Sequence, residues 1–162
     1  IGHGTGLWFE QVSIPLMIHG PGQEKGLRVG TTVGHVDILP TVLSTLGVPV
    51  PDHLPGRSLI SVATEADRDD RPLLMQSWIG WWGVQAGPFK LLRRPTGEKL
   101  FVVSAQGEEE ISPSAHPVLH TLMRRHLARL LNEAGTGAQQ VPDQALDDEL
   151  EEQLKQLGYV ME

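Results

Sequence analysis

A histidine flanked by glycines is the first feature of this sequence that could support chemistry. Residues 2–6 read Gly-His-Gly-Thr-Gly, which places His3 in the middle of a glycine-rich loop. Glycine adopts positive φ readily and lets a backbone come close to a ligand. His3 is therefore a candidate ligand contact. An ordinary loop residue with no special role is the alternative.

An apolar run follows this loop and must position it. Residues 14–18 read Ile-Pro-Leu-Met-Ile, and the segment closes with Gly-Pro-Gly at residues 20–22. A short apolar run bounded by turn residues predicts a strand buried on both faces. Ligands of open α/β sheets collect where loops meet strands. The start of the sequence is thus predicted to be the edge of an active site.

A helix is expected next. Asp37 can cap it, Pro40 falls in its first turn, where a missing N–H costs little, and Gly47 suits the position just after its end. Apolar residues recur at helical spacing along this segment. They are Leu39, Val42, Leu43 and Leu46.

The middle of the sequence alternates short β-type runs with turn residues. This spacing predicts an antiparallel meander of four strands. The runs are residues 73–78, 81–86, 89–93 and 100–103. The charged stretches 67–71 and 108–110 are interpreted as solvated turns.

A long helix is predicted from Ser114 to about Asn132, and residues 135–137, Gly-Thr-Gly, should end it. A final helix is expected from about Asp147. The apolar stripe of the long helix consists of Leu119, Leu122, Met123, Leu127, Leu130 and Leu131.

Composition excludes several classes of site and partner. The 162 residues carry 13 Lys and Arg against 20 Asp and Glu, a formal net charge of −7, and no basic stripe, which argues against a nucleic-acid partner. Cysteine is absent, so disulfides and thiolate metal sites are excluded. No apolar run in the sequence approaches the length that spans a bilayer.

The order of these segments resembles sulfatases of the alkaline-phosphatase superfamily. That family carries Gly-(His or Lys)-Gly-Thr-Ser-Leu-Tyr-Glu-Glu, then an apolar strand containing Pro, then Gly-Pro-Gly. Residues 2–22 follow this pattern without a gap, although Phe9 and Ser13 stand where Glu and Arg are common.

Later segments extend the resemblance. Residues 34–43, with 46–51 and 56–59, are similar to the family's next signature block. Residues 84–91 partly match the start of its small C-terminal sheet, and residues 154–160 resemble its closing phrase.

The resemblance implies an α/β, alkaline-phosphatase-like fragment. It would hold an edge strand and a helix of the main sheet, plus a small antiparallel sheet packed on a long helix. Residues 1–60 would end the catalytic α/β domain, 61–134 would form the C-terminal subdomain with its helix, and 135–162 a linker and terminal helix. The N-terminus is expected to be cut and the C-terminus nearly natural. The unpaired edge strand could lead to self-association.

The resemblance also implies a chemistry. In this family the loop histidine or lysine contacts the sulfate ester, so His3 is the candidate catalytic and substrate-binding residue. The family hydrolyses the ester with a formylglycine, made in a Cys/Ser-x-Pro-x-Arg motif, and a divalent cation, for which calcium is expected. That motif is absent, because neither Ser13 nor Ser112 is followed by it. The chain alone is therefore expected to hold no cofactor and to lack activity.

The leading hypothesis is the C-terminal part of a sulfatase. Two alternatives remain: part of a phosphonate or phosphodiester hydrolase of the same superfamily, and a non-catalytic α+β binding module. The tryptophans Trp78, Trp81 and Trp82 could form a carbohydrate platform, but burial of one or two of them is favoured. Three further histidines could suggest a metal site, but a solvated helix face is favoured. They are His116, His120 and His126.

Overall fold

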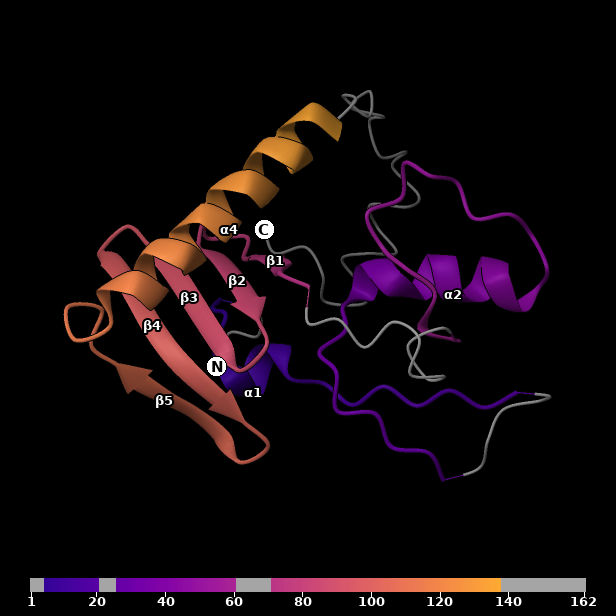
Figure 1. The fold of residues 1–162 in the computed structure, drawn as a ribbon, viewed down its shortest axis with the longest axis horizontal. Helices are drawn as coiled ribbons and strands as arrows, with labels where there is room; N and C mark the ends of the chain where they lie inside the picture. Colours follow the sequence, from indigo (N-terminus) through magenta and orange to yellow (C-terminus); the bar gives the residue numbers. More distant parts are fainter. Residues whose placement is uncertain (1–4, 21–25, 61–70, 138–162) are drawn as a thin grey trace, which may run out of the picture. The chain divides into compact units, whose positions relative to one another are not determined.

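The computed structural model describes residues 5–20, 26–60 and 71–137 of the chain (Figure 1). The chain divides into two compact units, residues 1–131 and 132–162. The predicted terminal helix and the closing phrase of the sequence lie outside the described residues. All described strands and the short helices belong to the first unit.

A five-stranded antiparallel sheet is the main element of the first unit (Figure 1). The strands pair in chain order, so each strand is joined to the next by a hairpin. The predicted four-stranded meander is confirmed as the first four of these strands. The five are β1 Leu73–Gln76, β2 Trp82–Ala86, β3 Phe89–Arg94, β4 Gly97–Ser104 and β5 Gly107–Ile111.

The fifth strand corrects the interpretation of residues 108–110 as a solvated turn. Glu108 lies opposite Val103 in the ladder, and Glu109 lies opposite Val102. Three consecutive glutamates give no strand signal, yet charged side chains are common on an edge strand, where they discourage pairing with other chains. The turn predicted here lies earlier, ahead of Gly107, whose φ is 144°.

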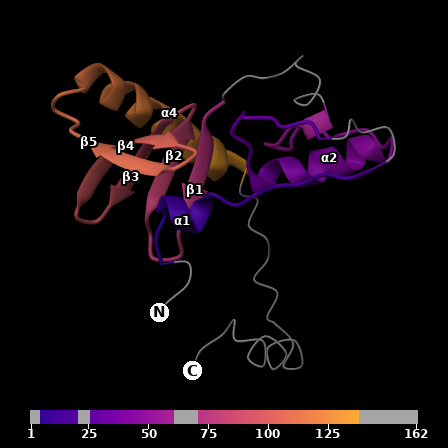
Figure 2. The same ribbon diagram turned by 90° about the horizontal axis from the view of Figure 1, so that it is seen from below.

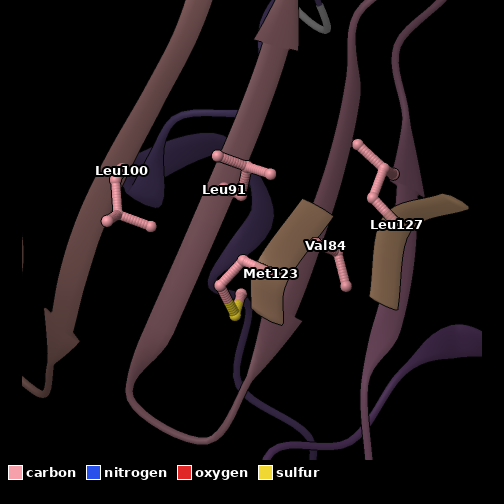
Figure 3. Close-up of a cluster of buried hydrophobic side chains, with 5 residues drawn as sticks. All are labelled: Val84, Leu91, Leu100, Met123 and Leu127. Atoms are coloured by element: carbon pink, nitrogen blue, oxygen red, sulfur yellow. The ribbon is translucent and has the colours of Figure 1, made fainter. Parts of the chain in front are cut away.

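Helix α4, Pro117–Gly137, covers one face of the sheet (Figures 1 and 3). The helix starts three residues after the predicted Ser114, at a proline whose missing N–H is no loss in a first turn. It also continues through the glycines that were expected to end it. The core between α4 and the sheet consists of Val84, Leu91, Leu100, Met123 and Leu127, all at most 1% exposed.

The opposite face of the sheet is covered by the start of the described chain. Leu7 packs there with Leu92 and Phe101, and the short helix α1, Phe9–Val12, follows. Figure 2 shows α1 on the side of the sheet away from α4. The sequence did not predict α1, because four residues are too few to show a helical period.

The prediction of a buried strand at residues 14–18 is wrong for this chain. The segment forms no strand, and no strand partner for it is found among the described residues. Its apolar side chains are exposed, with Met17 at 88% and Ile14 at 58%. A strand buried on both faces needs neighbours on both edges, and the described residues supply none.

Residues 35–45 form a 3-10 turn, η1 His35–Asp37, and helix α2, Ile38–Thr45. The predicted helix end is confirmed, since Gly47 follows with a φ of 68°. The apolar stripe, however, mostly faces solvent. Leu39, Val42 and Leu46 are between 48% and 70% exposed, while Pro40 and Thr41 are buried.

The described residues thus form an α/β structure with one face of its sheet on a long helix. No helix in the described ranges combines the length and apolar character needed to cross a membrane.

The core under α4 gives a first prediction. Replacing Leu127 with Ala removes a fully buried side chain and should lower the free energy of unfolding by about 2–5 kcal/mol. Leu122→Ala is the matched control, because Leu122 lies on the same helix but is 48% exposed, and it should cost less than about 1 kcal/mol. Chemical denaturation measures both. Equal losses would contradict the packing of α4.

Candidate functional site

The predicted site residue, His3, lies outside the described residues. The described part of its loop begins at Thr5. A Cβ atom at Gly6 would lie 2.7 Å from Gln11 Oε1 and 2.9 Å from Trp8 Cδ1, so the side chains of Trp8 and Gln11 pack closely on this glycine. The close approach of the loop backbone to a ligand stays a prediction.

Lys90 ties this segment to the sheet. Its side chain is 1% exposed, and its Nζ donates a hydrogen bond of 3.0 Å to the carbonyl oxygen of Leu7. The same ammonium pairs with the carboxylate of Glu108 on β5 and lies 5.2 Å from the ring centroid of Phe101. A charge buried this deeply persists only when it is paired and hydrogen-bonded. The contacts of Lys90 therefore fix where the loop leaves the sheet.

The pKa of Lys90 reflects this burial. Burial lowers the pKa of the ammonium, and the hydrogen bond and charge of Glu108 partly oppose the shift, with a smaller opposing effect from Glu10. The charged form of Lys90 is thus stabilised by the carboxylate of Glu108 rather than by solvent.

Aromatic and cationic side chains cluster beside Leu7 on the same face. The indole rings of Trp8 and Trp81 meet edge to face, with centroids 5.6 Å apart. The guanidinium carbon of Arg94 lies 6.0 Å and 5.5 Å from these two centroids. Lys99 Nζ lies 5.9 Å from the Trp8 centroid and pairs with Glu110.

The three tryptophans of the predicted platform do not share one environment. Trp78 is 78% exposed, whereas Trp81 and Trp82 are half-buried and pack against the two different cores. Two of the three are thus partly buried against the sheet. A carbohydrate platform stays a prediction.

Asp37 is the polar centre of the region around α2. The carboxylate is fully buried and accepts hydrogen bonds from the backbone N–H of Gly34 and of Arg57, both at 2.9 Å. It also pairs with the guanidinium of Arg71, which donates a further bond to the Pro55 carbonyl oxygen. Asp37 was predicted as a helix cap, but its side chain instead joins three separate segments.

Thr41 makes a second link between the same segments. Its hydroxyl donates to the Asp37 carbonyl oxygen at 2.6 Å and accepts from the Leu59 N–H at 2.9 Å. A Cβ atom on Gly56 would lie 1.8 Å from the Val36 carbonyl oxygen, so only glycine fits there. The sequence blocks around residues 34–43 and 56–59 are therefore joined by hydrogen bonds and close packing.

An apolar groove of about 340 Å³ lies beside this centre. It is lined by residues 16–19, by Ile38 and Val42 of α2, and by Leu46 and Leu59. The groove holds few polar groups and suits apolar contact rather than catalysis.

Glu98 is the centre of a polar cluster on the face of the sheet that α4 covers. Its carboxylate accepts a 3.0 Å bond from Arg93 Nε, lies 2.8 Å from His120 Nε2, and lies 3.5 Å from Arg124 Nε. Burial alone would raise the pKa of Glu98, but the bonds from His120 and Arg93 outweigh it, so the pKa lies below its usual value.

The histidines of α4 do not form a metal site. His120 binds Glu98 alone, and the part of the chain that the structure describes holds no group of three or more His, Asp or Glu able to bind a metal ion. The residues near Ser13 do not fit a formylglycine motif either, because Met17 stands at the position of the motif's arginine. No catalytic step through a metal or formylglycine is derived from these residues.

Comparison with known proteins finds sulfatases that are similar in sequence to part of the chain. The chain is 38% identical to human Arylsulfatase K over 68 residues, which are 41% of the chain and 13% of that protein. It is 31% identical to the mouse Arylsulfatase K over 100 residues, 59% of the chain and 18% of that protein. It is 39% identical to the Extracellular sulfatase SULF-1 homolog of Drosophila melanogaster over 57 residues, 35% of the chain and 5% of that protein.

The resemblance to sulfatases is confirmed over part of the chain. The aligned stretches span less than a fifth of each of these relatives. No family model matches the chain. The matches thus identify a sulfatase-related region, while the activity of a whole enzyme remains a proposal.

The contacts of Lys90 give a second prediction. Lys90→Met removes the donor to the Leu7 carbonyl, and hydrogen exchange at the amides of Gln11, Val12 and Ser13 should quicken about tenfold or more. Exchange in β3 should change little. Arg93→Met removes a more exposed ion pair on the opposite face of the same strand and is the control, which should leave these amides unchanged. Equal effects of the two variants would contradict an anchoring role for Lys90.

The lowered pKa of Glu98 gives a third prediction. A carboxylate whose folded-state pKa is lowered stabilises the fold above its usual pKa of 4.5, and loses that contribution as pH falls through the folded-state value. Glu98→Gln should therefore reduce stability most near pH 7, with the difference shrinking below pH 4.5. Glu109→Gln, at an exposed position on β5, should have little effect at any pH. A Glu98→Gln difference unchanged down to pH 2 would contradict this assignment.

Proposed function

We propose that this chain supplies the C-terminal part of a sulfatase that hydrolyses sulfate esters. The observation that carries the proposal is the similarity to curated sulfatases, which reaches 59% of the chain in one alignment. These alignments cover a small share of each relative, in keeping with a larger enzyme of which this sequence is one part.

The proposal assigns residues 1–60 to the end of a catalytic α/β domain with an alkaline-phosphatase-like fold. Residues 61–134 then form the C-terminal subdomain, and residues 135–162 a linker and terminal helix. The exposed apolar residues of the 14–18 segment and of α2 support this division, because they would be covered by the rest of such a domain. In the isolated chain the same surface would favour self-association.

His3 is proposed to contact the sulfate group of the substrate. A hydrogen-bond donor aimed at a sulfate oxygen stabilises the negative charge that shifts during ester cleavage, and it does so best when it is held in place beforehand. Lys90 would supply that positioning through Leu7, four residues along the chain from His3. The formylglycine nucleophile and the divalent cation would come from sequence outside this chain.

A fourth prediction tests this function in the longer protein that contains the chain. His3→Ala should lower kcat for an aryl sulfate about a hundredfold or more, because one preorganised donor is worth about 3 kcal/mol, while the thermal midpoint changes little. His19→Ala is the control, since His19 is an exposed histidine of the same segment, and its kcat should stay near normal.

Three outcomes decide the proposal. The 162-residue chain alone should show no turnover, since it lacks the nucleophile motif. Hydrolysis of a phosphodiester but not of a sulfate ester by the longer protein would favour the phosphodiesterase alternative. Normal kinetics of the His3→Ala protein would reassign His3 to an ordinary loop residue.

A further inference from the structure

We propose that Arg94 is an oxyanion-binding residue on the α1 face of the sheet, suited to a sulfate or carboxylate group carried on a ring. The proposal concerns binding by this chain and does not require that the chain belong to a sulfatase.

The guanidinium of Arg94 occupies a corner made by two indole rings. Trp8 and Trp81 stand nearly perpendicular to one another, at 88°, and the guanidinium carbon lies within 6.0 Å of both centroids. Contacts of this kind hold a guanidinium through its flat face and leave its terminal Nη groups able to donate hydrogen bonds.

Arg94 differs from the other cations of its hairpin in having no anionic partner among the described residues. On β3 and β4, Lys90 pairs with Glu108, Arg93 with Glu98, and Lys99 with Glu110. Within the described ranges no carboxylate pairs with Arg94, and its Nε is buried without a hydrogen-bond partner. A buried N–H without an acceptor is costly, so such a group calls for an explanation.

Because Nε itself is buried, an external ligand would meet the two terminal Nη groups of Arg94, and their chemistry favours an oxyanion. A guanidinium edge presents parallel N–H groups that match two oxygens of a sulfate or carboxylate. A second cation, Lys99, lies close to the same indole and adds positive potential, although Glu110 offsets part of it. The indole edges beside Arg94 can contact an attached ring, so a ring-borne oxyanion should bind better than a free ion.

Titration of the isotope-labelled 162-residue chain by nuclear magnetic resonance tests the proposal. Sodium phenyl sulfate, sodium benzoate and inorganic sulfate are added at constant ionic strength, with phenol as the neutral probe. The indole N–H signals of Trp8 and Trp81 should shift saturably with phenyl sulfate or benzoate, more weakly with inorganic sulfate, and not with phenol. Trp82 faces the α4 core and serves as an internal control.

Variants assign the effect to Arg94. Arg94→Gln should weaken binding of phenyl sulfate about tenfold or more, because a charge-assisted hydrogen-bonding group is lost. Arg94→Lys keeps the positive charge but lacks the parallel N–H groups of a guanidinium, and it should weaken binding to a smaller extent. Arg93→Gln is the matched control, since this neighbouring arginine points to the other face and pairs with Glu98, and its affinity should match that of the parent.

Circular dichroism checks that each variant is folded, and if Arg94→Gln is not, the Arg94→Lys affinity decides. Equal binding by the parent and the folded Arg94 variants would overturn the proposal, as would equal shifts with phenol. Loss of sulfatase activity in the longer protein would not bear on this result, because no turnover is measured.

Discussion

The buried ammonium group of Lys90 is the contact on which the arrangement of the α1 face depends. It joins β3 to the Leu7 carbonyl and to Glu108 on β5, so three segments far apart in the sequence meet at one charge. An ammonium in this position needs both partners, because neither solvent nor the surrounding apolar side chains can compensate it. The position of Leu7 is therefore linked, through Lys90, to Glu108 on the edge strand β5.

The alternation of β3 divides the sheet into two faces with different properties. Leu91 faces α4 and joins a dry core, whereas Lys90, Leu92 and Arg94 face α1. The α4 face holds apolar residues that contribute mainly to stability, with one polar group around Glu98. The α1 face combines a buried charge, indole rings and the guanidinium of Arg94, which no carboxylate of the described residues pairs. Groups able to bind an anion are thus concentrated on the face against which Leu7 packs.

Patterns within short stretches of the sequence predicted those strands and helices that depend mainly on neighbouring residues. Turn residues between short β-type runs predicted four strands, and the period of apolar residues predicted α4 with the buried Met123 and Leu127. Strand β5 was missed because its glutamates are stabilised by pairing with β4 and by Lys90, which no local pattern records. The strand at residues 14–18 was predicted from apolar character alone, yet a strand also requires a neighbour. The candidate site depended equally on distant contacts, so neither Lys90 nor Arg94 stood out in the sequence.

The two sequence blocks that resemble sulfatases, residues 2–22 and residues 34–59, are stabilised by different contacts. The second block is accounted for by its own hydrogen bonds, since Asp37 is buried and joins Gly34, Arg57 and Arg71. These contacts hold segments together around α2. The first block differs, because among its described residues Leu7 is held against the sheet by the hydrogen bond from Lys90 and by packing on Leu92 and Phe101. Chemistry on a sulfate group would therefore depend on the first block and the α1 face, with the second block maintaining the surface on which α2 presents its apolar side.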